Sequence, residues 1–343
     1  MNRSTVLRVS RREPCPICGH PDWCRVSPDG RFVLCNRIDS GRPAQGKGGG
    51  WLHWVDGAAR PPQPVHRDAH ESPRATSRAC EAAWDGILDQ LTLTPLHREH
   101  LRARGMDDVE ITHRRYRSMD GNRAEVVHKI RNRGIDTDGV PGFYRKANPR
   151  GVEYWTVAGP PGILIPVRDA AGMLSGMQIR ADEPLDGRKY VWLSSRDMPG
   201  GCSSGAPIHV ARPIGATRDP RIWLTEGPLK GDIAAERLGA VVVSVPGVNV
   251  WESGLAVCKT VSGRGDLDLI VAFDMDAETN PAVNLARAQL VYMAYERGYR
   301  VRVASWPAGF KGIDDALTAR AAYHLRPGSD VLESYSVYDG GER

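Results

Sequence analysis

The chain has 343 residues, of which 41% are hydrophobic and 25% charged, so it can form two or three compact units with ordinary cores. We find no run of about 18 apolar residues and no apolar N-terminal signal stretch, so we expect a cytoplasmic protein that contacts no membrane. The net charge is +5, and residues 1–150 hold 26 Lys and Arg against 18 Asp and Glu. A basic half beside an acidic site suits an enzyme that acts on a polyanion, and the alternative is an ordinary solvated surface.

The first predicted domain, residues 1–56, is a zinc-binding ribbon. Four cysteines fall close together in it: Cys15, Cys18, Cys24 and Cys35. The first two have the C-x2-C spacing that lets two thiolates reach one tetrahedral ion, and residues 25–34 are predicted to form a hairpin that returns the fourth cysteine to the third. In a cytoplasmic protein this pattern indicates a metal site rather than disulfides. His20 remains an alternative to Cys24 as the third zinc ligand.

A linker over residues 57–80 and a basic subdomain over residues 81–215 are predicted next. The linker mixes Pro, Ala, Ser, Arg and His without periodicity. Within the basic subdomain, residues 95–150 contain 13 Lys and Arg against 8 Asp and Glu. Three aromatic residues lie in or beside this stretch: Tyr116, Tyr144 and Trp155. Basic and aromatic residues together suit single-stranded nucleic acid, and a charged, solvated helix face is an equal alternative.

Two apolar runs in the second half of the chain end in acidic residues. The run 221–226 ends at Glu226 and is followed by helical spacing, so Glu226 is predicted to lie in a strand-to-helix turn of a parallel sheet. The second run ends at Asp274 and Asp276, whose spacing on a strand would place both side chains on one side. Carboxylates that converge at one sheet edge repel one another, and a divalent cation such as Mg²⁺ holds them together.

The predicted fold class is α/β, with a small parallel sheet in residues 216–325 and a C-terminal tail over 326–343. The expected strands alternate with helices. They are 221–226, 240–245, 268–274 and 299–305. The parallel sheet is preceded by an α+β subdomain and by the zinc ribbon.

These acidic motifs resemble the Toprim domain of DnaG-type primases, topoisomerases and some nucleases. The resemblance covers residues 216–325, and Toprim-like primases of phages, plasmids and mobile elements are the most similar members that we identify. It implies these catalytic residues, which also bind Mg²⁺ or Mn²⁺: Glu226, Asp274 and Asp276. Either Asp314 or Asp315 would help to bind a second metal, although Asp315 is equally suited to cap the helix expected at 315–322.

The chain departs from the family at two places. DnaG-type primases usually have an aspartate four residues after the glutamate, whereas this chain has Lys230 there and Asp232 two residues later. After the paired acids, the usual glycine-containing turn is replaced by Ala-Glu-Thr-Asn-Pro. Both departures imply a metal arrangement that differs from the family in detail.

The segment ahead of this domain is also similar to DnaG-type primases. Residues 162–168 and 175–180 are predicted strands joined by a turn. By resemblance, Arg180 and Lys189 would contact nucleotide phosphates or template. We group with them three further candidates: Arg168, Ser195 and Lys230.

The resemblance implies a DNA primase that makes short primers from NTPs on single-stranded DNA by metal-dependent nucleotidyl transfer. Its cofactors would be structural Zn²⁺ and catalytic Mg²⁺ or Mn²⁺, and a separate replicative helicase is a further candidate partner. One alternative is a metal-dependent nuclease with Glu226 as general base. Another is a non-catalytic zinc protein that binds nucleic acid as a replication adaptor. The three acids argue against this adaptor, because buried acids without a metal would destabilise the fold.

Overall fold

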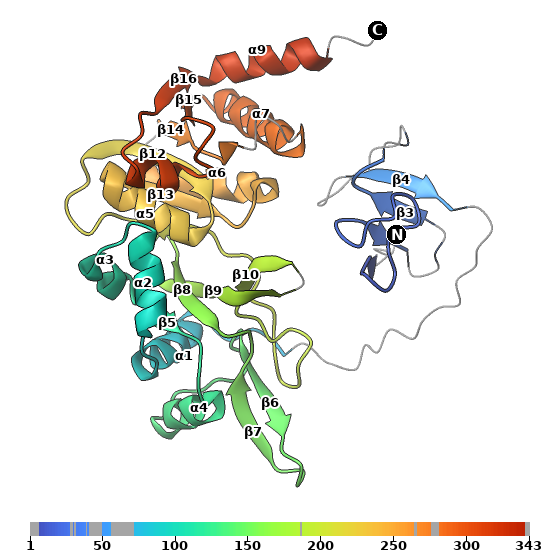
Figure 1. Cartoon of the computed structure of the whole chain (residues 1–343), viewed down its shortest axis with the longest axis vertical. Helices are drawn as coiled ribbons and strands as arrows, with labels where there is room; N and C mark the ends of the chain where they lie inside the picture. Colours follow the sequence, from blue (N-terminus) through green and yellow to red (C-terminus); the bar gives the residue numbers. More distant parts are fainter. Residues whose placement is uncertain are drawn as a thin grey trace. The chain divides into compact units, whose positions relative to one another are not determined.

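The computed structural model describes residues 7–27, 30, 32–38, 40, 50–55, 72–185, 187–263, 266–275 and 281–339. The chain divides into two compact units, Met1–Asp68 and Ala69–Arg343, which are described separately (Figure 1). Within the described ranges, no helix is long and apolar enough to cross a membrane.

The first unit is a small antiparallel sheet that carries the four clustered cysteines. Its strands pair in chain order and have these bounds: β1 (Leu7–Arg8), β2 (Arg25–Val26), β3 (Phe32–Cys35) and β4 (Trp51–Trp54). Apart from cysteines, the buried hydrophobic residues described in this unit are Val9 and Val33. So small a core cannot hold the unit together alone, and we expect a metal bound by the cysteines to stabilise it.

The second unit begins with a subdomain, residues 72–207, that combines helices with an antiparallel sheet. Its helices are α1 (Ser77–Gln90), α2 (Pro95–Ala103), α3 (Asp108–Arg114) and α4 (Arg123–Asn132). The sheet has the order β10-β9-β8-β5, with β5 (Arg117–Ser118), β8 (Gly162–Arg168), β9 (Leu174–Leu185) and β10 (Arg188–Trp192). A separate hairpin of β6 (Phe143–Ala147) and β7 (Glu153–Val157) extends from this subdomain beside α4 (Figure 1).

Helix α1 begins at Ser77, within the predicted linker. Thr76 caps it by accepting a hydrogen bond from the N–H of Ala79 at 3.3 Å, and Cys80 is buried within the helix. The predicted linker border at residue 80 therefore falls inside a helix. Residues 56–71, which make up most of that linker, lie outside the described residues.

The sheet of the first subdomain is covered on both faces. Leu164 and Ile179 pack with α1 and α4, whereas Ile163 and Ile165 pack with α2, α3 and the start of the following subdomain. The alternation of faces along β8 thus joins the two subdomains through one apolar core.

The second subdomain, residues 208–339, is built on a six-stranded sheet with the order β11-β13-β12-β14-β15-β16. The strands are β11 (His209–Ala211), β12 (Asp219–Glu226), β13 (Ala240–Val245), β14 (Asp268–Val271), β15 (Arg300–Ser305) and β16 (His324–Pro327). The helices are α5 (Pro228–Leu238), η1 (Val248–Val250), α6 (Trp251–Ser262), α7 (Pro281–Glu296), α8 (Ile313–Thr318) and α9 (Gly328–Asp339). The four inner strands are parallel, as predicted, and the two edge strands are antiparallel.

Helices cover both faces of this sheet, which confirms the mixed α/β class. Leu224 faces a core shared with α6, α7 and α9, whereas its neighbour Trp223 faces α5 and α8. The predicted tail over 326–343 is wrong, because β16 is the sheet's edge strand and α9 packs against α7 with Val331 buried.

Strand β14 ends earlier than predicted. It ends at Val271, although the N–H of Ala272 still donates to the carbonyl of Leu224 at 2.8 Å. Asp274 therefore lies in the loop after the strand, where strand alternation no longer fixes its direction. Asp276 lies outside the described residues.

Candidate active site and zinc centre

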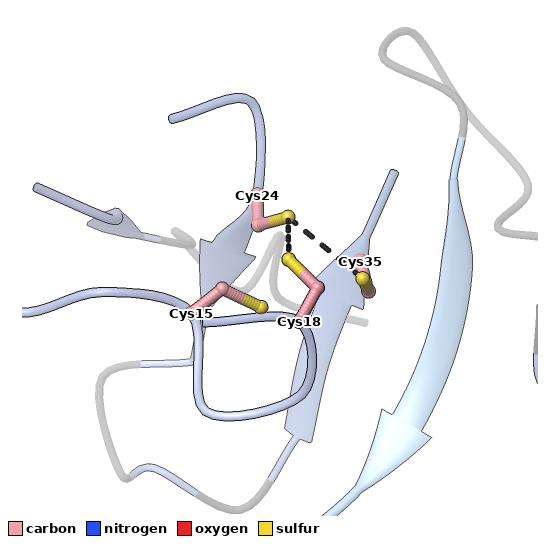
Figure 2. A group of neighbouring side chains, drawn as sticks. All are labelled: Cys15, Cys18, Cys24 and Cys35. Atoms are coloured by element: carbon pink, nitrogen blue, oxygen red, sulfur yellow. Dashed lines mark hydrogen bonds between the residues drawn. The ribbon is translucent and has the colours of Figure 1, made fainter. Parts of the chain in front are cut away.

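The four cysteines of the first unit meet at one point. Their Sγ atoms all lie within 4.8 Å of one another, with Cys18 to Cys24 at 3.7 Å and Cys24 to Cys35 at 3.9 Å (Figure 2). His20 is exposed and does not belong to the cluster. Four thiols at this spacing fit a tetrahedral zinc ion, so the structure favours Cys24 over His20 as the third ligand.

Backbone N–H groups support this cysteine cluster. Asn36 donates to Cys24 Sγ at 3.5 Å, and Ile38 donates to Cys35 Sγ at 3.3 Å. Burial alone would raise the pKa of Cys18, but hydrogen bonds from the His20 backbone and from neighbouring thiols lower this pKa to about 7. Donors aimed at sulfur stabilise thiolates, which are the form that binds zinc.

Glu226 lies at the carboxyl end of β12, in the strand-to-helix turn that the sequence predicts. Gly227 follows with φ of 80°, a conformation that glycine adopts without strain, and its N–H donates to Val245 O at 2.9 Å. Pro228 then opens α5. The turn fixes the half-buried Glu226 at the carboxyl edge of the inner, parallel strands.

Asp274 lies at the same edge and is paired with a lysine of α5. The ammonium of Lys230 donates to both carboxylate oxygens, with 2.5 Å to Oδ2. Lys311 Nζ is also 3.8 Å from Oδ2. Only 8% of the Asp274 side chain is exposed, so the Lys230 contact is largely shielded from solvent and stronger than a surface ion pair.

Asp314, on α8, is buried and pairs with Arg104 of the loop after α2. Burial raises the pKa of Asp314 above its usual value, although Arg104 and Lys230 oppose this. Its Oδ1 atom has no hydrogen-bond partner among the described residues. Asp315 is the third residue of α8 rather than its cap, with Oδ2 3.5 Å from the N–H of Gly312.

These acids do not form a ready-made metal cluster. Among the described residues, the four cysteines make up the one group of three or more side chains placed to share an ion. Asp276, which the sequence places at the same edge, lies outside the described residues. Carboxylate oxygens are nevertheless the ligands that a hard divalent cation prefers, and Oδ1 of Asp314 has no hydrogen-bond partner among the described residues.

A group of basic side chains lies next to these acids. The sequence predicted two of them, Arg180 and Lys189, as phosphate contacts, whereas His100 and Arg104 were missed. Burial, together with the charges of Arg180, Arg104 and Lys189, lowers the pKa of His100 to about 4. His100 Nε2 and the Nε atoms of Arg104 and Arg180 are buried without a described partner. His100 and Arg104 are four residues apart around the end of α2, a spacing that could have indicated a shared face. We call these four residues the basic cluster.

The other predicted phosphate contacts lie elsewhere. Arg168 is at the far end of the β8–β9 hairpin from Arg180, about 17 Å away by strand rise, and its guanidinium donates to Gly172 O at 3.0 Å. Ser195 is 1% exposed, and its hydroxyl donates to Phe143 O at 2.8 Å. A buried hydroxyl cannot contact nucleotide, so the prediction for Ser195 is wrong.

The three aromatic candidates have different environments. Tyr116 is fully buried and its hydroxyl donates to Asp232 Oδ2 at 2.5 Å, so it cannot stack on a base. Trp155 on β7 is half-buried, with the guanidinium groups of Arg131 and Arg145 at 4.9 Å and 5.7 Å from its ring centre. Tyr144 is half-buried on the same hairpin.

Asp232 belongs to a buried polar network between the two subdomains. Its carboxylate accepts hydrogen bonds from Arg114, from Tyr116 and from His209 Nε2, the last at 3.0 Å. Arg114 also donates to Glu236 Oε1 at 2.6 Å. The three groups that contact Asp232 are buried, and Glu236 beside Arg114 is 11% exposed, so this acid serves the fold rather than a metal.

In the second unit, acids thus lie at the carboxyl edge of the parallel strands, beside a group of basic side chains. The structure is similar to the RNA polymerase domain of the Mycobacterium tuberculosis primase DnaG, with a TM-score of 0.54 and 14% identity over 77% of this chain and 88% of that domain. The same domain in complex with a double-stranded DNA oligomer with a 6-nucleotide overhang gives 0.54 and 15%, over 78% of this chain and 86% of that one.

A further similar structure contains a zinc-binding domain as well. The zinc-binding and RNA polymerase domains of the Aquifex aeolicus primase match with a TM-score of 0.51 and 14% identity, over 90% of this chain and 78% of that one. Residues 216–323 match a family model described as a domain of unknown function (DUF3854). Comparison with curated proteins finds no match. At these identities the comparisons show the fold of DnaG primase catalytic cores.

Proposed function

We propose that the protein is a DNA primase that synthesises short primers from NTPs on a single-stranded DNA template. The observation that carries this proposal is the basic cluster beside the carboxylate edge, joined to it by the contact of Arg104 with Asp314. The Nε atoms of Arg104 and Arg180 lack a described hydrogen-bond partner, and such guanidinium groups suit the phosphates of an NTP or a template. Neighbouring acids suit the metal that such chemistry requires. The similar structures are polymerase domains of primases, which supports this use of the fold.

The second subdomain is then a Toprim domain. Glu226, Asp276 and Asp314 would hold Mg²⁺ or Mn²⁺, which supplies activation of the attacking 3′-hydroxyl and neutralisation of the leaving pyrophosphate. The oxygen donors and the unpartnered Oδ1 of Asp314 fit such an ion.

The chain's own side chains position the substrate. Arg180 and Lys189 would hold the triphosphate, and Arg104 would fix the acidic edge against them. His100 has a pKa of about 4 and is therefore neutral near pH 7, where its ring can donate or accept a hydrogen bond without adding positive charge.

The template would pass over the basic first subdomain. The β6–β7 hairpin exposes Arg145, Lys146 and Arg150, and Trp155 lies beside them. Such side chains bind phosphates and stack on bases without strong sequence preference. We propose that the zinc ribbon makes further template contacts. We also propose that the protein belongs to a phage, plasmid or other mobile element and works with a replicative helicase of that element or of its host.

Incorporation of labelled NTPs on single-stranded DNA, with Mg²⁺ or Mn²⁺, tests the proposal. We expect the parent to make short products and Asp276→Asn to lose activity by orders of magnitude, because the metal loses a charged ligand. Asp330→Asn removes an exposed acid of α9 and should keep parental activity.

The same assay with an end-labelled template separates the alternatives. Metal-dependent cleavage of that template without synthesis would favour a nuclease. Template binding without either reaction would favour a replication adaptor, and both results would reject primase function.

A further inference from the structure

Lys230 pairs with an acid of the carboxylate edge. Its ammonium contacts both oxygens of Asp274, and 22% of the Lys230 side chain is exposed. The pair links α5 to the loop after β14 across 44 residues of sequence. An ammonium in contact with both oxygens occupies the side of the carboxylate that would otherwise face a metal ion.

The surroundings of Lys230 keep it in this position. The Lys230 stem passes close to Gly312, where a Cβ atom would be in ordinary contact with Cδ and Cε of the lysine at 3.4 Å and would clash with Asp314 Oδ1. The positive charge of Lys230 also acts on Asp314, whose pKa it lowers. Lys230 therefore lies close to two acids of the edge, Asp274 and Asp314.

Asp314, the second buried acid of this edge, also has a cation of the chain as its partner. Asp314 pairs with Arg104, which lies 3.7 Å from Asp315 Oδ1 as well. Each of the two buried acids described at this edge thus has a cation of the chain as its partner. A divalent ion added at Asp274 would meet the ammonium at short range, and the two like charges would repel.

We propose that Lys230 is a built-in cation that replaces one divalent ion at this edge, so that the protein binds a single Mg²⁺ or Mn²⁺ there. The inference rests on the proposed function in that the remaining ion serves nucleotidyl transfer. The ammonium supplies the positive charge that a second ion would bring to Asp274. It is a point charge without an exchangeable water, so it stabilises charge but cannot activate a hydroxyl.

Counting bound Mn²⁺ by electron paramagnetic resonance tests this proposal on the zinc-loaded full chain. We expect about one Mn²⁺ in the parent and about two in Lys230→Asp, where an acid takes the place of the ammonium. Lys230→Gln is a second variant, which replaces the ammonium by a shorter, neutral polar group and frees Asp274. It should also gain an ion, and its melting temperature should rise with Mn²⁺ more steeply than that of the parent.

Lys311→Gln is the matched control. Lys311 Nζ is 3.8 Å from the same carboxylate, but 67% of its side chain is exposed, so we expect the ion count to remain at about one. A parent with two ions, variants of Lys230 with the parental count, or no Mn²⁺ in any of them would overturn the proposal. Primer synthesis is measured separately: a parent with two ions that makes primers refutes this inference alone, whereas a parent with one ion and no product refutes the proposed function alone.

Discussion

Replacement of Asp232 by asparagine should destabilise the second unit strongly without touching the carboxylate edge. Asp232 is 2% exposed and carries the negative charge that faces the 8% exposed Arg114. Removal of one partner from a buried ion pair costs about 3–5 kcal/mol, because the other charge remains buried. Glu236 still accepts from Arg114 at 2.6 Å, which places the expected loss in the free energy of unfolding near the lower limit, about 3 kcal/mol.

Thermal unfolding at several pH values measures this loss. A unit of this size should melt about 6–12 °C lower. Arg114 and His209 lower the pKa of Asp232 despite its burial. The stabilisation is therefore complete above the ordinary carboxyl pKa of about 3.9 and is lost as the pH falls through the lower folded value. The difference in melting temperature between the parent and Asp232→Asn should be constant from about pH 5 to 8 and should become smaller below about pH 4.

Asp108→Asn provides the matched control for this measurement. Asp108 also pairs with arginines, Arg98 and Arg102, but it does so at the surface. We expect no measurable change in melting temperature, because solvent screens such pairs. An Asp232→Asn protein that melts with the parent at pH 7 would refute the structural role of the network.

Three further predictions concern the zinc centre and the basic cluster. Cys35→Ser should release about one zinc per chain and loosen residues 7–55, as metal analysis and proteolysis would show; a zinc content equal to that of the parent would contradict the four-cysteine site. Arg180→Ala and Lys189→Ala should weaken binding of NTP or single-stranded DNA and make its salt dependence shallower, and unchanged binding at every salt concentration would exclude phosphate contacts there. The parent should lose stability as the pH falls from about 6.5 towards 4, because the pKa of His100 is about 4 in the folded state and about 6.5 in the unfolded state. His100→Gln should lose less stability over the same range. Identical profiles of melting temperature against pH would refute the buried, neutral histidine.

The sequence predicts the inner strands well because β12, β13 and β14 contain apolar runs and β15 alternates arginine with apolar residues. It extends β14 to Asp274, because hydrophobicity continues through Phe273 after the strand's hydrogen bonds have ended. The edge strand β16 was missed because residues His324–Pro327 have little apolar character. They are held as a strand by their pairing with β15, which the local sequence does not reveal.

The pairs that shape the site could not be predicted, because they join residues far apart in the chain. Lys230 and Asp274 are 44 residues apart, and Arg104 and Asp314 are 210 apart. A lysine near a motif indicates a charge but not the acid it will contact. The same limit led to the wrong prediction for Ser195, whose motif position gives no sign of its burial.

Arginines tie the two subdomains of the second unit together in both directions. Arg104 and Arg114 reach from the first subdomain to acids of the second, and Arg237 of α5 reaches back to Glu110 and to the carbonyl of Gly105. A cut near residue 207 would leave buried charges without partners on both fragments. Recombination that exchanged the acid-bearing half alone would therefore have to supply acids and an arginine that match the partners retained in the first subdomain.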